Sequence, residues 1–427
     1  MTPPSSRGIR HGVRQLIMVV TALSGLAGVG PAYGEGTGDW PWSAPSFEEI
    51  SGFVALEGRL FARPERFAGQ ARHSGSLLAE PEAYIEWDDD TSVTLTPFLR
   101  LDSADPGRSH ADLRELELRV IGDDWELAGG VGKVFWGVAE SKHLVDIINQ
   151  TDVVENLDLE DKLGQPMANL TLIRDWGYVD LFAMPYFRER TFQERGGRLR
   201  NALVADVGQA RFTSKAGRWH PDFALRYANS FGDWDLGLAH FYGTSRDPTL
   251  NLGLSSGGEL VLVPEYELIN QTSLDLQYTT GAWLWKLEAL FRQGQKNRLG
   301  TEQNYYSAIG GFEYTLYGIM DSVADLGLIG EYIRDSRRDK ATDPLENDVF
   351  VGARLALNDE PDSQLLAGII QDLDQSTRLM FVEASRRVGE SMKLTVELRA
   401  FSAVQREDLL SDLRDDDFIQ IELAYYY

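Results

Sequence analysis

The chain ends in Ile419-Gln-Ile-Glu-Leu-Ala-Tyr-Tyr-Tyr427, and this stretch decides the fold. Its odd-numbered residues, which are isoleucine, leucine or tyrosine, fall on one side of a pleated strand, and Gln420 and Glu422 fall on the other. A soluble antiparallel sheet can show the same alternation. A strand with lipid on one side and a wet lumen on the other requires it. The ending therefore predicts a membrane-spanning strand.

The same alternation recurs along the rest of the chain. Eighteen segments show it: 51–61, 77–88, 91–101, 112–121, 124–134, 167–176, 178–188, 222–229, 234–242, 272–280, 282–292, 304–317, 323–335, 348–358, 363–372, 377–388, 392–401 and 418–427. Tight turns follow the even segments and longer polar links the odd ones, except at 373–376. Short turns on one rim, long loops on the other and an even strand count are typical of transmembrane barrels.

We therefore predict an all-β fold, a transmembrane antiparallel β-barrel of about 18 strands, with 16 as the alternative, over residues 51–427. A barrel of this size is wide enough for an aqueous channel. The segment 259–269 also alternates, but it is assigned to a loop because counting it would break the parity. The segments 222–229 and 363–372 could each slip by one residue, which would exchange their two faces.

The aromatic last residue resembles the end of bacterial outer-membrane β-barrels, whose final strand characteristically ends in an aromatic residue on the lipid side. The resemblance implies an outer-membrane location, contact with lipid and lipopolysaccharide, and recognition of the C-terminal strand by the barrel-assembly machinery. Porins of this kind commonly form homotrimers. TonB-dependent transporters, which carry an N-terminal plug, fit less well because residues 35–50 are too few to form one.

The N-terminus predicts export. Arg7, Arg10 and Arg14 precede an apolar stretch over 16–30, and Ala32-Tyr33-Gly34 places small residues where signal peptidase reads them. A membrane anchor fits less well because the stretch is shorter than the roughly 20 residues of a spanning helix. We expect residues 1–34 to be a signal peptide and residues 35–50 to be a periplasmic lead to the barrel.

The net charge and the composition restrict the kinds of molecule that this protein is expected to bind. The net charge is −25, and removing the three arginines of the signal leaves −28, so binding to nucleic acid is not expected. Acidic loops that divalent cations bridge to lipopolysaccharide would explain this charge, and so would a vestibule that attracts cations. The chain has no cysteine, so no disulfide supports the fold.

Tryptophan placement predicts an aromatic girdle at one membrane interface. Six of the ten tryptophans lie within four residues of a tight turn, and two C-terminal tyrosines join them. The predicted girdle consists of Trp87, Trp125, Trp176, Trp234, Trp283, Trp285, Tyr425 and Tyr427. The alternative is a set of unrelated core aromatics.

Charged residues on the predicted lumen faces are the pore-lining candidates. They are Glu57, Arg59, Arg100, Glu115, Glu117, Arg119, Lys286, Glu288, Arg292, Arg354, Lys393, Glu397 and Arg399. An arginine row facing a carboxylate row would orient and filter charged solutes. The same residues could equally form a ladder that only neutralises itself inside the wet interior. Both interpretations stay open.

The third long link, 135–166, is the candidate constriction loop. It has the position of the loop that trimeric porins fold into the barrel, although it shares no motif with it. Its run 144–148 is amphipathic and helix-like, and its candidate residues are Lys142, His143, Asp146, Asp152 and Glu155. The alternative is a lid outside the barrel.

Two acidic clusters, Asp152 to Asp161 and Asp412 to Asp417, suggest loosely bound Ca²⁺, although neither has the EF-hand spacing and such clusters are more often solvated faces. No other cofactor is expected. The histidines 73, 110, 143, 220 and 240 show no pairing, and no nucleophile or metalloprotease motif occurs, so we do not expect an enzyme. The sequence favours a porin-like channel for passive diffusion of small hydrophilic solutes. The alternative is a non-conducting structural or adhesion barrel whose loops bind a partner.

Overall fold

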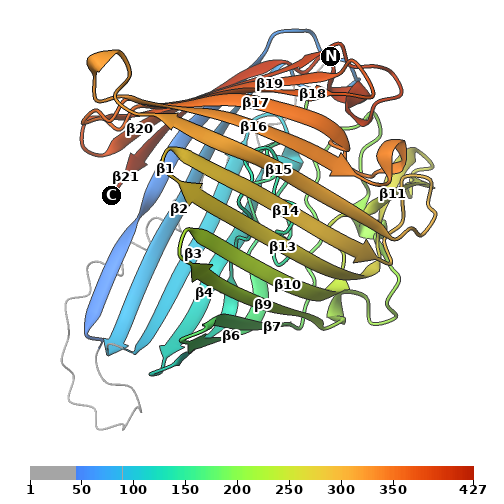
Figure 1. The fold of residues 1–427 in the computed structure, drawn as a ribbon. Helices are drawn as coiled ribbons and strands as arrows, with labels where there is room; N and C mark the ends of the chain where they lie inside the picture. The colour runs from blue at the N-terminus through green and yellow to red at the C-terminus, as the bar shows by residue number, and fades with distance from the viewer. Residues whose placement is uncertain (1–44, 89) are drawn as a thin grey trace, which may run out of the picture. The chain divides into compact units, whose positions relative to one another are not determined.

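A computed structural model describes residues 45–427 of the chain apart from Asp89. The predicted signal peptide and residues 35–44 of the lead lie outside the described residues. The described chain contains one closed barrel of eighteen strands, each antiparallel to its neighbours (Figure 1). The first strand, β1, pairs with the last, β21, from Phe61 opposite Phe418 to Phe53 opposite Tyr426, which seals the cylinder.

The barrel strands fall in the predicted segments. They are β1 (Phe47–Phe61), β2 (His73–Asp88), β3 (Thr91–Asp102), β4 (His110–Ile121), β5 (Trp125–Gly132), β6 (Gln165–Arg174), β7 (Gly177–Met184), β9 (Asp222–Phe231), β10 (Trp234–Thr244), β13 (Leu268–Thr280), β14 (Trp283–Gln293), β15 (Tyr305–Leu316), β16 (Asp325–Asp335), β17 (Asn347–Ala356), β18 (Gln364–Asp372), β19 (Arg378–Val388), β20 (Met392–Ser402) and β21 (Phe418–Tyr426). The prediction of 18 strands is confirmed.

Several strand boundaries differ from the prediction; for example, β2 begins at His73 and not at residue 77, and β7 ends at Met184 and not at residue 188. Two of the differences move residues from one predicted region to another. Strand β1 begins at Phe47, so residues 47–50 of the predicted lead belong to the barrel, because Phe47 and Ile50 pair with Glu86 and Ala83 of β2. Strand β6 begins at Gln165, so the last two residues of the candidate constriction loop are already in the sheet. The assignment of 259–269 to a loop is correct for residues 260–266, whose strand does not join the barrel, but Leu268 and Ile269 already belong to β13 and pair with Thr244 and Gly243 of β10.

The long loops carry the remaining structure. Strands β11 (Thr249–Leu254), β12 (Leu260–Tyr266) and β8 (Arg211–Phe212) form a separate three-stranded sheet. The 3-10 helices are η1 (Pro106–Arg108), η2 (Val207–Gln209), η3 (Gly217–Trp219), η4 (Ile319–Asp321), η5 (Arg338–Lys340) and η6 (Leu409–Leu413). No helix in the described part of the chain is long and apolar enough to cross a membrane.

The outer face of the barrel is apolar. Leu56 and Leu423 lie opposite each other on β1 and β21 with 64% and 41% of their surfaces exposed, and Leu95 on β3 is 36% exposed. Register resolves the two uncertain segments, because Phe223 and Ile369 point outward while Asp222 and Ile370 are buried. A closed ladder with an apolar exterior satisfies the backbone inside hydrocarbon.

Aromatic side chains gather at the tight-turn rim. Rings stack across neighbouring strands there: the centroids of Trp234 and Tyr278 are 4.4 Å apart, and those of Trp283 and Tyr314 are 4.5 Å apart. Trp176, Trp285, Tyr425 and Tyr427 are exposed, and Trp87 and Trp125 are half-buried. That this aromatic row lies at a membrane interface stays a prediction.

Candidate functional site

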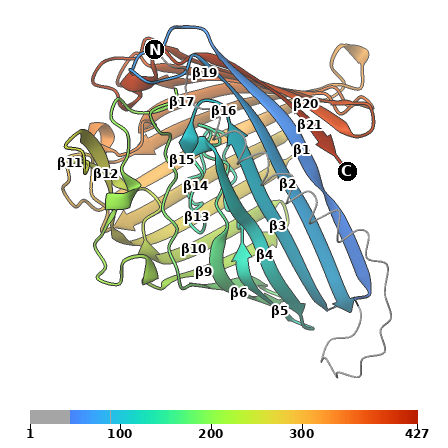
Figure 2. The same cartoon turned by 180° about the vertical axis from the view of Figure 1, so that it is seen from behind.

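The chain between β5 and β6, residues 133–164 and hereafter the inner segment, runs through the interior of the barrel (Figure 2). Its apolar residues Val145, Ile147 and Ile148 are at most 2% exposed. They pack on inward-facing side chains of the wall such as Phe182 and Phe241. The predicted helix-like run at 144–148 is therefore not a helix but an irregular coil, and its apolar residues face the wall.

Two buried wall carboxylates replace the hydrogen bonds that a helix would have made. Glu288 of β14 accepts from the backbone N–H groups of residues 138, 139, 144 and 145, at donor–acceptor distances of 2.7, 2.9, 2.6 and 3.2 Å. Glu331 of β16 accepts from the backbone N–H groups of Glu140 and Ser141 at 2.7 and 2.8 Å. Charge-assisted bonds of this kind are about twice as strong as neutral ones, so Glu288 and Glu331 fix residues 138–145 against the wall.

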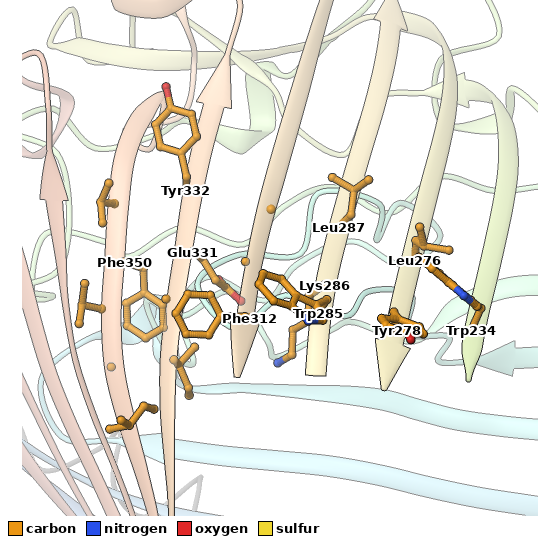
Figure 3. Close-up of a pocket in the computed structure, with 18 residues that line it drawn as sticks. Trp234, Leu276, Tyr278, Trp285, Lys286, Leu287, Phe312, Glu331, Tyr332 and Phe350 are labelled. Atoms are coloured by element: carbon orange, nitrogen blue, oxygen red, sulfur yellow. The ribbon is translucent and has the colours of Figure 1, made fainter. Parts of the chain in front are cut away.

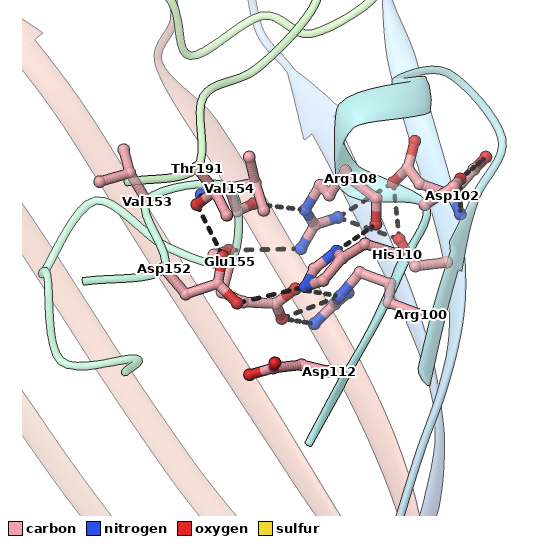
Figure 4. A network of polar contacts seen from close by, with 12 residues as sticks. Arg100, Asp102, Arg108, His110, Asp112, Asp152, Val153, Val154, Glu155 and Thr191 are labelled. Atoms are coloured by element: carbon pink, nitrogen blue, oxygen red, sulfur yellow. Dashed lines mark hydrogen bonds and ion pairs between the residues drawn. The ribbon is translucent and has the colours of Figure 1, made fainter. Parts of the chain in front are cut away.

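A network of arginines and carboxylates holds the far end of the inner segment (Figure 4). Arg100 of β3 donates from Nε to both carboxylate oxygens of Glu155 at 2.9 and 2.8 Å. Its Nη1 lies 2.9 Å from Glu57 of β1, and Arg108 is 2.8 Å from the same carboxylate. All four side chains are at most 6% exposed. Glu57 and Arg100, two pore-lining candidates, therefore act here as anchors.

Asp152 is the second carboxylate of this network. Arg114 donates to it at 2.7 Å, Thr191 donates at 2.7 Å, and the Nε2 of His110 lies 3.2 Å away. Burial alone would raise the pKa of Asp152, but the hydrogen bond from His110 and the charge of Arg114 lower it to about 2. Asp152 is therefore ionised, and the donors around it stabilise its negative charge.

On β20, Glu397 and Arg399 bind residues 156 and 158 of the inner segment. Arg399 donates to Asp158 at 3.2 Å, and the amide of Asn156 donates to Glu397 at 3.0 Å. Arg354 of β17 donates to Glu140 at 2.6 Å. The inner segment is therefore held by strands on several sides of the barrel interior.

The remaining pore-lining candidates do not meet in one place. Glu115, Glu117 and Arg119 lie on β4 toward the tight-turn rim, where Arg119 pairs with Glu117 at 2.6 Å. Strand register places Lys393 on the inner face near the same rim, opposite Arg387. Three further candidates complete the set: Arg59 donates to the backbone oxygen of Glu155, Lys286 lies 3.7 Å from Glu313, and Arg292 lies 3.0 Å from Asp247.

The loop between β7 and β9, residues 185–221, was not predicted to take part. Its Gln193 donates to the backbone oxygen of Val153 at 3.0 Å, and Arg190 pairs with Asp247 at 2.7 Å. Arg198 is 4% exposed and pairs with Asp416 at 2.7 Å. The arginine-rich stretch 188–200 was the signal that could have revealed this loop as a second layer over the inner segment.

A cavity of about 360 Å³ remains beside the inner segment. Three of the constriction candidates line it: Lys142, which pairs with Asp343 at 2.8 Å, His143, whose Nε2 is 3.9 Å from Glu160, and Asp146, which pairs with Lys162 at 3.0 Å. Asp152 and Glu155 do not line the cavity, because the arginine network encloses them. The other walls come from β14 to β16, from β18 to β20 and their loops, and from Arg190 and residues 246–248 of the β7–β9 and β10–β11 loops.

The chain's own donors occupy part of both acidic clusters. His110, Asp152 and Glu155 bring three ligand atoms within 4.8 Å, but guanidinium groups already bind both carboxylates. In the second cluster Asp415 pairs with Arg63 at 2.8 Å, and the backbone N–H of Ala202 donates to Asp412 at 2.7 Å. Asp158 of the first cluster lies instead in a second group of three carboxylates, with Glu383 and Glu397.

Another hollow lies on the outside of the barrel. It measures about 1020 Å³, and Figure 3 shows the rings of Trp285 and Phe312 along it. It forms where Gly310 and Gly330 of β15 and β16 present no side chain outward. This hollow opens on the apolar exterior, away from the inner segment, so it is not on a path through the lumen.

The closed ladder, the apolar exterior and the charged interior define a β-barrel of the bacterial outer membrane. No protein-family model and no curated protein matches the sequence. Among solved structures the chain is similar to OmpT, an outer membrane protein of Vibrio cholerae in trimer form, at 11% identity over 89% of this chain and 99% of that one, with a TM-score of 0.43.

It is also similar to a mutant porin of Rh. blastica, at 10% identity over 89% of this chain and 100% of that one, with a TM-score of 0.43. A third similar structure is Wzi of Escherichia coli, described as a carbohydrate-binding β-barrel involved in group 1 capsule assembly. It is 10% identical over 87% of this chain and 83% of that one, with a TM-score of 0.49.

Proposed function

We propose that the barrel is a porin-like channel through which small hydrophilic solutes diffuse passively across the outer membrane, without enzymatic activity. The observation that supports it is the inner segment, which is held inside the barrel by Glu288 and Glu331 on one side and by Arg100 on another, with a cavity beside it. A segment fixed in this way narrows a lumen without needing to move, as selectivity filters do.

The charged wall residues would then divide their roles. Glu57, Arg59, Arg100, Glu288, Arg354, Glu397 and Arg399 hold the inner segment. Arg292 lines the cavity, and Glu115, Glu117, Arg119, Lys286 and Lys393 would line the wider part of the channel. Lys142, His143 and Asp146 would form the inner-segment side of the constriction.

Conductance of the purified protein in planar bilayers tests this proposal. Deleting residues 139–162 removes the part of the inner segment that Glu288, Glu331 and Arg399 bind. If the segment forms the constriction, the deletion variant will conduct more than the intact protein. A barrel that stays ion-tight at all voltages in both forms would remove the channel function.

The alternative, a non-conducting barrel whose loops bind a partner, is favoured by one observation. Apolar clusters around Ile148 and Ile333 and the ion pairs around Glu57 fill much of the interior. An ion-tight barrel in both forms of the previous experiment would support this alternative.

Homotrimer formation, which cross-linking in intact membranes would detect, and loose binding of Ca²⁺ both remain predictions.

A further inference from the structure

We propose that the cavity beside the inner segment binds a short peptide with free termini and apolar side chains, with its carboxylate toward β14 and β15 and its ammonium toward β19 and β20. This inference deepens the proposed function, since it names a solute that the channel would select. It depends on three features of the cavity: a cationic end, an acidic end and an apolar stretch between them.

The cationic end consists of Lys142, Arg190, Arg292 and Arg337, all of which line the cavity. Three carboxylates face them. Asp247 lies between Arg190 and Arg292 at 2.7 and 3.0 Å, Asp335 pairs with Arg337 at 2.8 Å, and Asp343 pairs with Lys142. Four cations against three carboxylates leave one unit of positive charge, which matches one further carboxylate.

Donors remain free at this end. The Nε of Arg292 donates to Gln271 and its Nη1 to Asp247, while its Nη2 has no hydrogen-bond partner among the described residues and is not fully enclosed. The Nζ of Lys142 has three hydrogens and one carboxylate, Asp343, within ion-pair distance in the described chain. Arg337 lies 3.6 Å over the ring of Tyr305, which keeps its guanidinium flat against the wall.

The acidic end has the opposite imbalance. Among the described residues Arg399 is the one cationic side chain that donates to Asp158, Glu383 and Glu397, at 3.2, 2.8 and 2.5 Å, and the neutral amide of Asn156 also donates to Asp158 and Glu397. One ligand oxygen of each carboxylate lies within 4.8 Å of the others. Two units of negative charge are therefore uncompensated. Burial raises the pKa of Asp158 to about 6, as expected for a carboxylate with too few cationic partners. An ammonium group would compensate one of these two charges.

The wall between the two ends is apolar, which is unusual for the inside of a water-filled barrel. Leu366 and Ile370 of β18 and Leu379 and Phe381 of β19 point inward and line the cavity. Ile370 lies opposite Leu379, and Leu366 lies opposite Glu383, so the apolar stretch continues directly into the acidic end. Apolar side chains of a solute would bury their surface there.

Spacing selects the peptide among molecules with two opposite charges. Arg292 and Glu383 come from β14 and β19, five strands apart around the wall, and neighbouring strands are about 4.8 Å apart. Side chains reach inward from both ends and shorten this gap. A single amino acid is too short to touch both ends, whereas about three residues at ~3.3–3.6 Å each can bridge them. The cavity volume is in the range typical of small-ligand sites.

Equilibrium binding to the full-length protein in detergent tests the inference without a membrane. Titration calorimetry would compare free Leu-Ala-Leu with its N-acetyl form, its C-terminal amide and Gly-Gly-Gly. We expect the free peptide to bind at least ~10-fold more tightly than each of the other three, the ratio that corresponds to ~1.4 kcal/mol. Equal binding of the N-acetyl form would indicate a simple anion site, and equal binding of the amide a simple cation site. Either result, or the absence of binding, would overturn the proposal.

Two substitutions test which end of the cavity binds the peptide's carboxylate and which end binds its ammonium group. Lys142→Gln should abolish the preference for the free peptide over the amide, and Glu383→Gln should abolish the preference over the N-acetyl form. Lys296→Gln is the matched control for the first, because Lys296 also pairs with a loop carboxylate, Glu265, but does not line the cavity. Glu313→Gln is the control for the second. If a variant fails to fold, the comparison of the four peptides on the unmodified protein still tests whether the cavity binds a peptide with free termini.

The outcome separates this inference from the channel itself. Conductance without peptide binding would leave the channel standing and remove the peptide site. Peptide binding by a barrel that never conducts would keep the site and remove the channel.

Discussion

Glu288 is the residue whose substitution most directly tests how the inner segment is held. Its two carboxylate oxygens accept four backbone N–H groups, two from residues 138 and 139 and two from Leu144 and Val145, and the side chain is fully buried. In Glu288→Gln one of these oxygens becomes an NH₂ group. Two of the four N–H donors would then face another donor and lose their acceptor.

The size of the effect follows from the number of lost bonds. An unsatisfied buried donor costs about 1–3 kcal/mol, so two of them weaken docking of residues 138–145 by about 2–6 kcal/mol. The lower figure corresponds to roughly 30-fold in the docking equilibrium. The inner segment would leave the wall more often, and the lumen would be wider while it is undocked.

Two assays measure this change. Hydrogen exchange of the Leu144 and Val145 amides should accelerate by at least ~30-fold in Glu288→Gln, because these amides exchange when the segment opens. Single-channel recordings should show larger or noisier current steps. Glu82→Gln is the matched control, since Glu82 also lies on the inner face, opposite Ser51 of β1, and no hydrogen bond or ion pair joins it to the inner segment in the described part of the chain. If exchange and conductance in Glu288→Gln both equal those of the control, the anchoring role of Glu288 is wrong.

Three further outcomes are expected. Spin labels at Leu95 and Leu423, both on the exposed apolar exterior, should report a hydrocarbon environment, and an aqueous signal would contradict the barrel's orientation. Because burial raises the pKa of Asp158 to about 6, its negative charge is lost as the pH falls from 7 to 5. Cation selectivity, read from reversal potentials in a KCl gradient, should decrease over that range, and the decrease should be smaller in Asp158→Asn. Glu57→Ala leaves three buried guanidinium groups without their shared carboxylate and should destabilise the barrel by about 3–5 kcal/mol in urea titrations; an unchanged midpoint would contradict the role of Glu57.

The strands could be predicted because each one carries its own evidence. Lipid on one side and water on the other impose an alternation that can be recognised within ten residues, as in β21, and turn chemistry then separates one strand from the next. The starts of β1 and β6 were missed by a few residues, because residues at strand ends such as Phe47 and Gln165 are specified by their pairing partners rather than by alternation.

The interior could be predicted only in part. Position along the chain indicated that 135–166 was the loop to examine, and its charged residues were recognised. What the sequence could not show is that Glu288, some 150 residues away, binds the backbone of this loop, since any backbone N–H is a suitable donor whatever its side chain. The β7–β9 loop was missed for the same reason, because Arg190 and Arg198 have partners that only the folded chain brings near.

The pairing of β1 with β21 has a consequence for biogenesis. Until Phe418 to Tyr426 are available, the nascent sheet has two open edges, and every backbone donor on them can capture another polypeptide. Completion joins residues more than 350 positions apart, a contact that forms late and slowly in any unassisted chain. A cell that makes this protein must therefore protect the two open edges of the incomplete sheet until β21 has been synthesised.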